Sequence, residues 1–261
     1  MRRSVFLCNR STTSTYRNSA LLRCRQCSIV LRLPRPTSAD LRALYEESWT
    51  EPEVNSAETG AMSSPLATAL VDELERTLHK REGRSVSGAR ILEFGAGSGK
   101  MAQALSQRGA EVRTVEPFGH ERLLKMGFDN VRKLSDLPQR LRFDGISSFD
   151  VVEHLIEPWV ELSDLKTRLV PGGWLLVSTP NLRGLNAMLT GSKWREFNKA
   201  GHITMFSPKG LIGMLENSGF SDVQQVDWRI DYGRGPHKRI VGRALQLMKL
   251  EGALRVLAIA A

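Results

Sequence analysis

Residues 89–105 read ARILEFGAGSGKMAQAL, and this stretch decides the fold. Two apolar residues, Ile91 and Leu92, lead to a carboxylate at Glu93, glycines follow at 95, 97 and 99, and a helical pattern begins at Lys100. Glycines at a strand-to-helix turn let the backbone bend sharply and approach a ligand closely. The stretch therefore predicts a strand, a tight ligand-binding turn and a helix.

Two carboxylates indicate which ligand the turn would hold. Glu116 ends the next predicted strand, 21 residues after Gly95, where an acid can accept hydrogen bonds from both ribose hydroxyls of an adenosine. Glu93 lies two residues before Gly95, and its charge would be repelled by a pyrophosphate. S-adenosylmethionine carries adenosine, a sulfonium and an ammonium but no phosphate, so it fits both carboxylates. NAD fits the pattern Gly97-x-Gly99-x-x-Ala102 but not Glu93.

Strands and helices alternate from residue 89 onward, which predicts a doubly wound α/β sheet. An earlier helix starts at Ser64 and Pro65. We expect residues 1–50 to form a separate appendage, 51–63 a polar linker and 64–261 the main domain. The predicted strands cover residues 90–94, 111–117, 130–134, 143–149, 171–181, 221–228 and 253–260, and the predicted helices that alternate with them cover 99–109, 120–128, 157–170, 207–220 and 237–252.

The charge of the chain is concentrated at its start. Of the net charge of +9, eight charges are arginines within residues 1–39, which contain no acid. The rest of the chain is nearly balanced, so the sequence lacks a basic footprint that covers a whole domain and nucleic acid is an unlikely partner. No apolar run reaches the roughly 20 residues that a membrane-spanning helix needs, so no membrane span is predicted.

Five segments together resemble the class I S-adenosylmethionine-dependent methyltransferases, in particular the small-molecule subgroup that includes the ubiquinone-pathway O-methyltransferases. The resemblance covers about residues 64–261 and implies a Rossmann-like, seven-stranded sheet with helices on both faces and an antiparallel last strand. The segments are LEFGAGSGK (92–100), TVEP (114–117), FDGISSFDVVEHLIEP (143–158), LVPGGWLLVSTPN (169–181) and GHITMFSPKGLIGMLENSGF (201–220).

The resemblance assigns cofactor-binding residues by position. Glu93, Gly95, Gly97 and Gly99 match the glycine-rich motif, and Glu116 matches the ribose-binding acid. Two further assignments follow: Asp136, with Ser135, falls in the segment that reads the adenine amino group, and Phe149 occupies a position that flanks the sulfonium and adenosine.

Methyl transfer needs a general base only where the acceptor loses a proton, and histidine suits that role near neutral pH. His154 follows the fourth predicted strand of the main domain, and His202 lies in the segment that covers the acceptor pocket in related enzymes. We expect these two as the candidate catalytic residues, with residues 181–206 as a lid over the acceptor. Asp150 and Glu153 have unremarkable spacing, so no catalytic metal is predicted.

All three cysteines lie in the N-terminal segment. Residues 21–49 resemble the second half of a zinc-ribbon tail that precedes some methyltransferases of this subgroup, which implies a structural zinc on Cys8, Cys24 and Cys27. Ser11 stands at the fourth ligand position, so the set is incomplete. An alternative interpretation is a mitochondrial transit peptide, since residues 1–39 are rich in Arg and Ser and free of acids.

The predicted function is methyl transfer from S-adenosylmethionine to a small-molecule acceptor, with oxygen as the expected acceptor atom. The alternatives are an RNA or protein acceptor, and a cofactor-binding assembly or regulatory subunit without turnover. The main body lacks cysteine, which suits the reducing cytoplasm; the mitochondrial alternative depends on the transit-peptide interpretation. The oligomeric state is left open.

Overall fold

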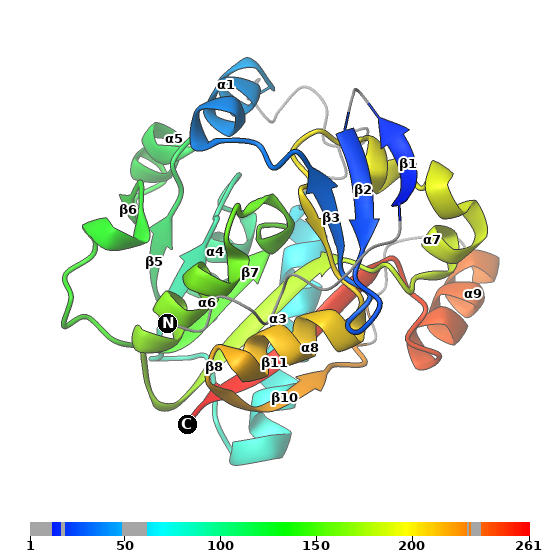
Figure 1. Ribbon diagram of the computed structural model, residues 1–261. Helices are drawn as coiled ribbons and strands as arrows, with labels where there is room; N and C mark the ends of the chain where they lie inside the picture. The colour runs from blue at the N-terminus through cyan, green and yellow to red at the C-terminus, as the bar shows by residue number, and fades with distance from the viewer. Residues whose placement is uncertain (1–11, 17–18, 49–61, 229, 231–235) are drawn as a thin grey trace.

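The computed structural model describes residues 12–16, 19–48, 62–228, 230 and 236–261 (Figure 1). Two of the sequence-based predictions fall outside this range. Cys8, one of the predicted zinc ligands, is not among the described residues, and neither are residues 51–61 of the predicted linker.

A seven-stranded sheet forms the centre of the molecule, in the order β10-β11-β8-β7-β4-β5-β6. The pairs β8–β7, β7–β4, β4–β5 and β5–β6 are parallel, whereas β11 runs antiparallel to both of its neighbours. The predicted fold class, an α/β sheet of seven strands with an antiparallel last strand, is therefore confirmed. The strands are β4 (Arg90–Phe94), β5 (Glu111–Val115), β6 (Asp129–Val131), β7 (Phe143–Phe149), β8 (Leu169–Pro180), β10 (Phe220–Gln225) and β11 (Ala253–Ala260).

Helices cover both faces because the strands present apolar side chains to both. Along β4, Ile91 belongs to one buried cluster and Leu92 to the other, as the alternation of side chains in a strand requires. The Ile91 cluster packs against α3 and α4, and the Leu92 cluster against α6 and α8. The helices are α3 (Ser64–Glu82), α4 (Lys100–Gln107), α5 (His120–Lys125), α6 (Pro158–Thr167), α7 (Leu185–Thr190), α8 (Pro208–Asn217) and α9 (Pro236–Leu247).

Several element boundaries differ from the sequence-based expectation by a few residues, and the boundary between α6 and β8 has a clear physical reason. The helical pattern predicted to continue to Val170 ends at Thr167, and β8 begins at Leu169. Leu169 is buried and pairs with Phe143 of β7, so burial in the sheet prevails over the local helical pattern. Around Pro171–Gly173 this long strand is irregular, and its register with β7 shifts there.

The N-terminal segment forms a second sheet together with the main body. Strands β1 (Thr12–Tyr16), β2 (Ser19–Arg23) and β3 (Val30–Leu33) are joined by β9 (Thr204–Met205), in the order β1-β2-β3-β9. Helix α1 (Ser38–Ser48) follows β3 and lies near α5 (Figure 1). Residues 19–48 are thus connected to the main body through β9, and the division at residues 51–63 stays a prediction.

Candidate functional site

The glycine-rich turn joins β4 to α4 at the edge of the sheet where the parallel strands end. Gly95, Gly97 and Gly99 have φ angles of 77°, 51° and 77°, in the left-handed region that favours glycine. A Cβ on Gly95 would lie 2.2 Å from a methyl carbon of Val151, whereas a Cβ on Gly97 would meet no atom within 4 Å. The turn is therefore packed tightly at Gly95 and open at Gly97, as a ligand cradle requires.

Glu116 follows β5 and connects the glycine turn to the next loop. Its carboxylate accepts hydrogen bonds from the backbone N–H of Gly97 at 2.9 Å, Phe118 at 2.8 Å and Gly119 at 3.3 Å. An ionised carboxylate offers about four lone-pair sites, so one remains for a ligand hydroxyl. The structure thus brings together the turn and the acid that the sequence placed 21 residues apart.

Asn130 on β6 holds the loop that carries Glu116. Its side-chain amide donates to the Glu116 carbonyl at 3.0 Å and lies 2.6 Å from Nδ1 of His120, and its oxygen accepts from the Thr114 hydroxyl at 2.8 Å. Asn130 is buried, so this fixed network is shielded from water. Nothing in the sequence pointed to this residue.

Glu93 is a buried carboxyl group inside the sheet, on β4. Burial raises its pKa to about 8, and the Ser147 hydroxyl on β7, which donates to Oε2, opposes this shift. Glu93 is therefore mostly protonated at neutral pH in the free protein. A cation brought beside it would favour the ionised form, which agrees with the sequence-based argument for a cationic ligand.

The other two predicted cofactor residues lie at the ends of β6 and β7. Asp136 is exposed in the loop after β6, where its carboxylate accepts from the backbone N–H of Lys133 at 3.0 Å and caps a short 3₁₀ helix. Phe149 ends β7 half-buried and packs against the cluster beneath α3 and α4. Among the contacts of the described residues, none joins Asp136 or Phe149 to the glycine turn.

Asp150, directly after β7, has a φ of 54°, an uncommon conformation for a residue with a side chain. Its N–H donates to the Ser178 carbonyl of β8 at 2.8 Å, which holds this conformation in place. Asp150 is reached by solvent, yet surrounding protein raises the pKa of its carboxyl group by desolvation. Residues in uncommon backbone conformations concentrate at functional sites.

The imidazole rings of the two predicted catalytic residues, His154 and His202, lie next to each other. The ring centroids of His154 and His202 are 4.7 Å apart, and the planes are nearly perpendicular. Burial lowers the pKa of His154 to about 4 and that of His202 to about 2. Both rings are therefore neutral at physiological pH and able to accept a proton or a cation at a ring nitrogen.

Glu153 completes a cluster with these histidines. It is fully buried, and the Thr179 hydroxyl donates to its Oε2 at 2.8 Å, while Oε1 has no hydrogen-bond partner among the described residues. Burial and the charge of Asp150 raise its pKa well above the ordinary value. Within the described part of the chain, ligand atoms of Glu153, His154 and His202 lie within 4.8 Å of one another, a set that suits a divalent cation by type.

Tyr45 of α1 belongs to this cluster and was not among the predicted site residues. Its hydroxyl oxygen is 2.6 Å from Nδ1 of His154, and its ring centroid is 5.0 Å from that of Phe118. Nothing in the sequence relates residue 45 to residue 154.

The predicted lid, residues 181–206, is packed on the body in this structure. Trp194, Met205 and Phe206 are buried, and Trp194 and Phe197 have ring centroids 5.2 Å apart. Trp194 and Met205 join Leu21 and Val30 of the N-terminal sheet in one apolar cluster. These aromatic residues stabilise the loop against the N-terminal segment.

The predicted zinc ligands that the structure describes lie in the turn between β2 and β3. Cys24 is buried, and its Sγ accepts from the Cys27 N–H at 3.4 Å. The Cys27 carbonyl accepts from the Ser207 hydroxyl at 2.6 Å, so the turn is docked on the start of α8. With Cys8 outside the described residues, the zinc site stays a prediction.

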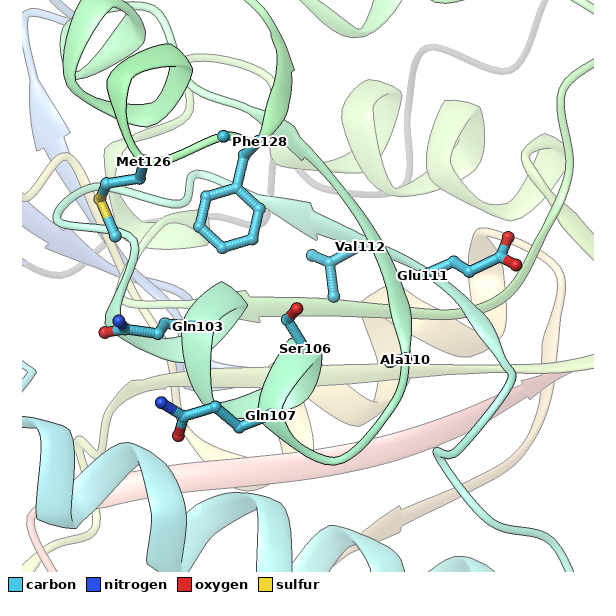
Figure 2. A pocket seen from close by; sticks show the side chains of 9 residues that line it. Gln103, Ser106, Gln107, Ala110, Glu111, Val112, Met126 and Phe128 are labelled. Carbon is cyan, nitrogen blue, oxygen red and sulfur yellow. The ribbon is translucent and has the colours of Figure 1, made fainter.

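A separate hollow of about 550 Å³ lies on the outer surface between α4, β5 and the segment after α5 (Figure 2). Its lining combines four polar residues, Gln103, Ser106, Gln107 and Glu111, with apolar residues such as Phe128. It adjoins the carboxyl-terminal half of α4, whereas the glycine turn precedes the helix. The hollow is therefore distinct from the cluster around Glu116 and His154.

Comparison with known proteins places the chain among methyltransferase domains. A family model described as a methyltransferase domain matches residues 65–225. A tRNA U34 carboxymethyltransferase of Edwardsiella ictaluri is 31% identical over 159 residues, which cover 54% of this chain and 48% of that protein. A ubiquinone biosynthesis O-methyltransferase of Xylella fastidiosa strain M23 is 30% identical over 138 residues, covering 48% and 53%. The chain thus spans about half the length of these relatives.

Among solved structures, a SAM-dependent methyltransferase from Archaeoglobus fulgidus superimposes with a TM-score of 0.56 and 19% identity. The match covers 80% of this chain and all of the other. This likeness supports the fold. Within the described segments, no helix is both long enough and apolar enough to span a lipid bilayer.

Proposed function

Because this chain belongs to the methyltransferase-domain family and has the class I S-adenosylmethionine-dependent methyltransferase fold, we propose that it transfers a methyl group from S-adenosylmethionine to a small-molecule acceptor at oxygen. One observation carries the proposal. A buried carboxyl group, an open glycine turn and a second carboxylate adjoin one another at the ends of β4 and β5.

These residues fit the cofactor chemically. Glu116 would accept one ribose hydroxyl at its remaining lone-pair site, and the open side of Gly97 would let the backbone approach the ligand. Glu93 would face the cationic methionine part, which favours ionisation of its carboxyl group. Gly95 and Gly99 would shape the turn, Asp136 would read the adenine, and Phe149 would flank the sulfonium. When bound, the cofactor supplies an electrophilic methyl group.

The histidines favour a particular kind of acceptor. A hydroxyl group loses its proton as its oxygen is methylated, and His154 or His202 would take that proton. A general base works best when its pKa lies near the operating pH, and both histidines have depressed pKa values. Such weak bases suit an acidic hydroxyl, so we propose a phenol, with a pKa of about 10 as for tyrosine, over a sugar alcohol.

The first test measures cofactor binding in two matched variants, each of which changes one carboxylate at an end of β5. Glu116→Gln should weaken S-adenosylhomocysteine binding at least tenfold by calorimetry, since hydrogen bonds to a charged acceptor contribute about 1.5–3 kcal/mol each. Glu111→Gln alters an exposed carboxylate at the opposite end of the strand and should leave the affinity unchanged. Equal affinities in both variants would contradict the assigned site.

Transfer is tested next with radiolabelled S-adenosylmethionine and a panel of catechols, simple phenols, sugars and bulk tRNA. Labelled phenolic products that disappear in Glu116→Gln would support the proposal. Cofactor binding without transfer to any acceptor would favour a binding subunit.

A second candidate is an RNA acceptor, because one relative is named as a tRNA-modifying enzyme. RNA binding through phosphates weakens steeply with salt. Methylated tRNA together with salt-dependent affinity would replace the small-molecule proposal.

A cytoplasmic location stays part of the proposal and is tested by fractionation.

A further inference from the structure

The N-terminal segment fixes both loops that carry the catalytic candidates. Arg32 of β3 is buried, and its guanidinium donates to the carbonyls of Phe197 at 2.7 Å, His202 at 3.2 Å and Lys199 at 3.3 Å. Arg35, just after β3, donates to the Ile156 carbonyl, two residues beyond His154. Residues far apart in sequence are thereby held in one arrangement around the histidines.

Tyr45 extends this connection to the His154 ring itself. Nδ1 of His154 has two oxygen atoms within hydrogen-bond distance, the Tyr45 hydroxyl at 2.6 Å and the Gly201 carbonyl at 2.8 Å. The Tyr45 ring also packs beside Phe118, whose N–H donates to Glu116. Tyr45 therefore touches both the histidine and the loop of the ribose-binding candidate.

The identity of these partners decides which ring nitrogen carries the proton. A carbonyl oxygen can only accept, so the short contact with Gly201 requires a proton on Nδ1 of His154. The neutral ring then has no proton on Nε2, which is left free to accept one. The Tyr45 hydroxyl accepts from the same Nδ1–H, and its own proton remains available for donation.

We propose that Tyr45 is a positioning residue for methyl transfer: its hydroxyl, a second acceptor beside the Gly201 carbonyl, helps to hold His154 in the Nδ1–H tautomer with Nε2 free to take the acceptor proton. The proposal rests on the proposed function in giving His154 the role of base. It makes α1, in the segment expected as an appendage, a working part of the site. A phenylalanine at position 45 would keep the ring packing and lose only the hydroxyl.

The first test measures the His154 tautomer and needs no acceptor. The full chain, labelled with ¹⁵N-histidine, is compared by two-dimensional NMR as wild type, Tyr45→Phe and Glu46→Gln, and His154→Gln assigns the signals. Glu46 is exposed on the same helix and serves as the control. We expect one Nδ1–H tautomer of His154 in the wild type and in Glu46→Gln. In Tyr45→Phe we expect the ¹⁵N chemical shifts of Nδ1 and Nε2 of His154 to move toward each other. Unchanged His154 shifts in Tyr45→Phe would overturn the proposal.

The second test measures turnover with a phenolic acceptor. Tyr45→Phe should lower kcat roughly three- to tenfold, the loss expected for one hydrogen bond, and leave S-adenosylhomocysteine affinity within twofold. An equal kcat in Tyr45→Phe and in the wild type would also overturn the proposal for Tyr45. The two proposals can also fail separately. If Tyr45→Phe changes the His154 tautomer but the wild-type protein methylates no acceptor, the proposed function is contradicted, whereas the effect of Tyr45 on His154 remains supported.

Discussion

At the scale of single residues, Glu93 shows how burial sets the chemistry of the site. Its carboxyl group lies inside the sheet, and desolvation raises its pKa to about 8 despite the hydrogen bond from Ser147. A carboxyl group in this state is neutral until a cation arrives. Its titration therefore connects both ligand affinity and protein stability to pH.

Ligand affinity should rise with pH between 5.5 and 7.5. Protonated Glu93 must lose its proton to favour a cationic ligand, so binding of S-adenosylmethionine should strengthen by up to about tenfold per pH unit and release a proton. Calorimetry in buffers of different ionisation enthalpy measures both quantities. In Glu93→Gln the pH dependence should largely vanish, and a wild-type dependence retained in this variant would refute the role of Glu93.

Stability of the free protein should change in the opposite direction. The folded protein holds the Glu93 proton up to a pKa of about 8, whereas the unfolded chain releases it near 4.5, so this contribution to stability is complete below pH 4.5 and is lost as pH rises to 8. The slope from this group is at most about 1.4 kcal/mol per pH unit. Urea unfolding at several pH values should therefore show a flatter profile for Glu93→Gln than for the wild type.

At the scale of elements, the turn between β4 and α4 combines two glycines with different constraints. Gly95 packs against Val151, which follows β7, so it connects two neighbouring strand ends. Gly97 faces open space and donates its N–H to Glu116. The first glycine serves packing, and the second is placed where a ligand would approach.

Alanine at these two positions should separate stability from binding. Gly95→Ala combines a left-handed φ with overlap against Val151 and should destabilise the protein by roughly 3 kcal/mol, whereas Gly97→Ala should cost only about 1 kcal/mol. Gly97→Ala should nevertheless weaken S-adenosylhomocysteine binding at least tenfold, because its methyl group occupies the open side. Denaturant unfolding and calorimetry check the two effects.

The double variant Gly95→Ala with Val151→Ala provides the control for the packing argument. Removing the methyl groups that overlap should restore part of the lost stability. A double variant no more stable than Gly95→Ala would show that the overlap is not the cause.

At the scale of the whole molecule, the two sheets are joined around the histidines. β3 pairs with β9, and the side chain of Arg32 satisfies three carbonyls of the loop that leads into β9. Buried carbonyls without partners are costly, so these contacts couple the N-terminal sheet to the loop that carries His202.

Arg32→Met should therefore destabilise the protein by roughly 2–4 kcal/mol, because the buried carbonyl of His202 and the partly buried carbonyls of Phe197 and Lys199 lose a charged donor. Arg25→Met, at an exposed position in the β2–β3 turn, should change the unfolding free energy by less than about 0.5 kcal/mol. Denaturant unfolding measures both variants. A similar small effect in both would mean that the two sheets are not energetically coupled.

The sequence alone determined the doubly wound fold and the proximity of the glycine turn to Glu116. This was possible because Glu93 and the glycines lie within one strand, turn and helix, and Glu116 ends the next strand, so local periodicity and spacing place them together. Only the tertiary structure decided the acceptor side. Tyr45 and His154 are 109 positions apart, and Arg32 and His202 are 170 apart, so their contacts follow from packing between distant segments. Such packing leaves no periodic pattern in the chain, because it depends on side-chain shape and on which loop the N-terminal strands pair with.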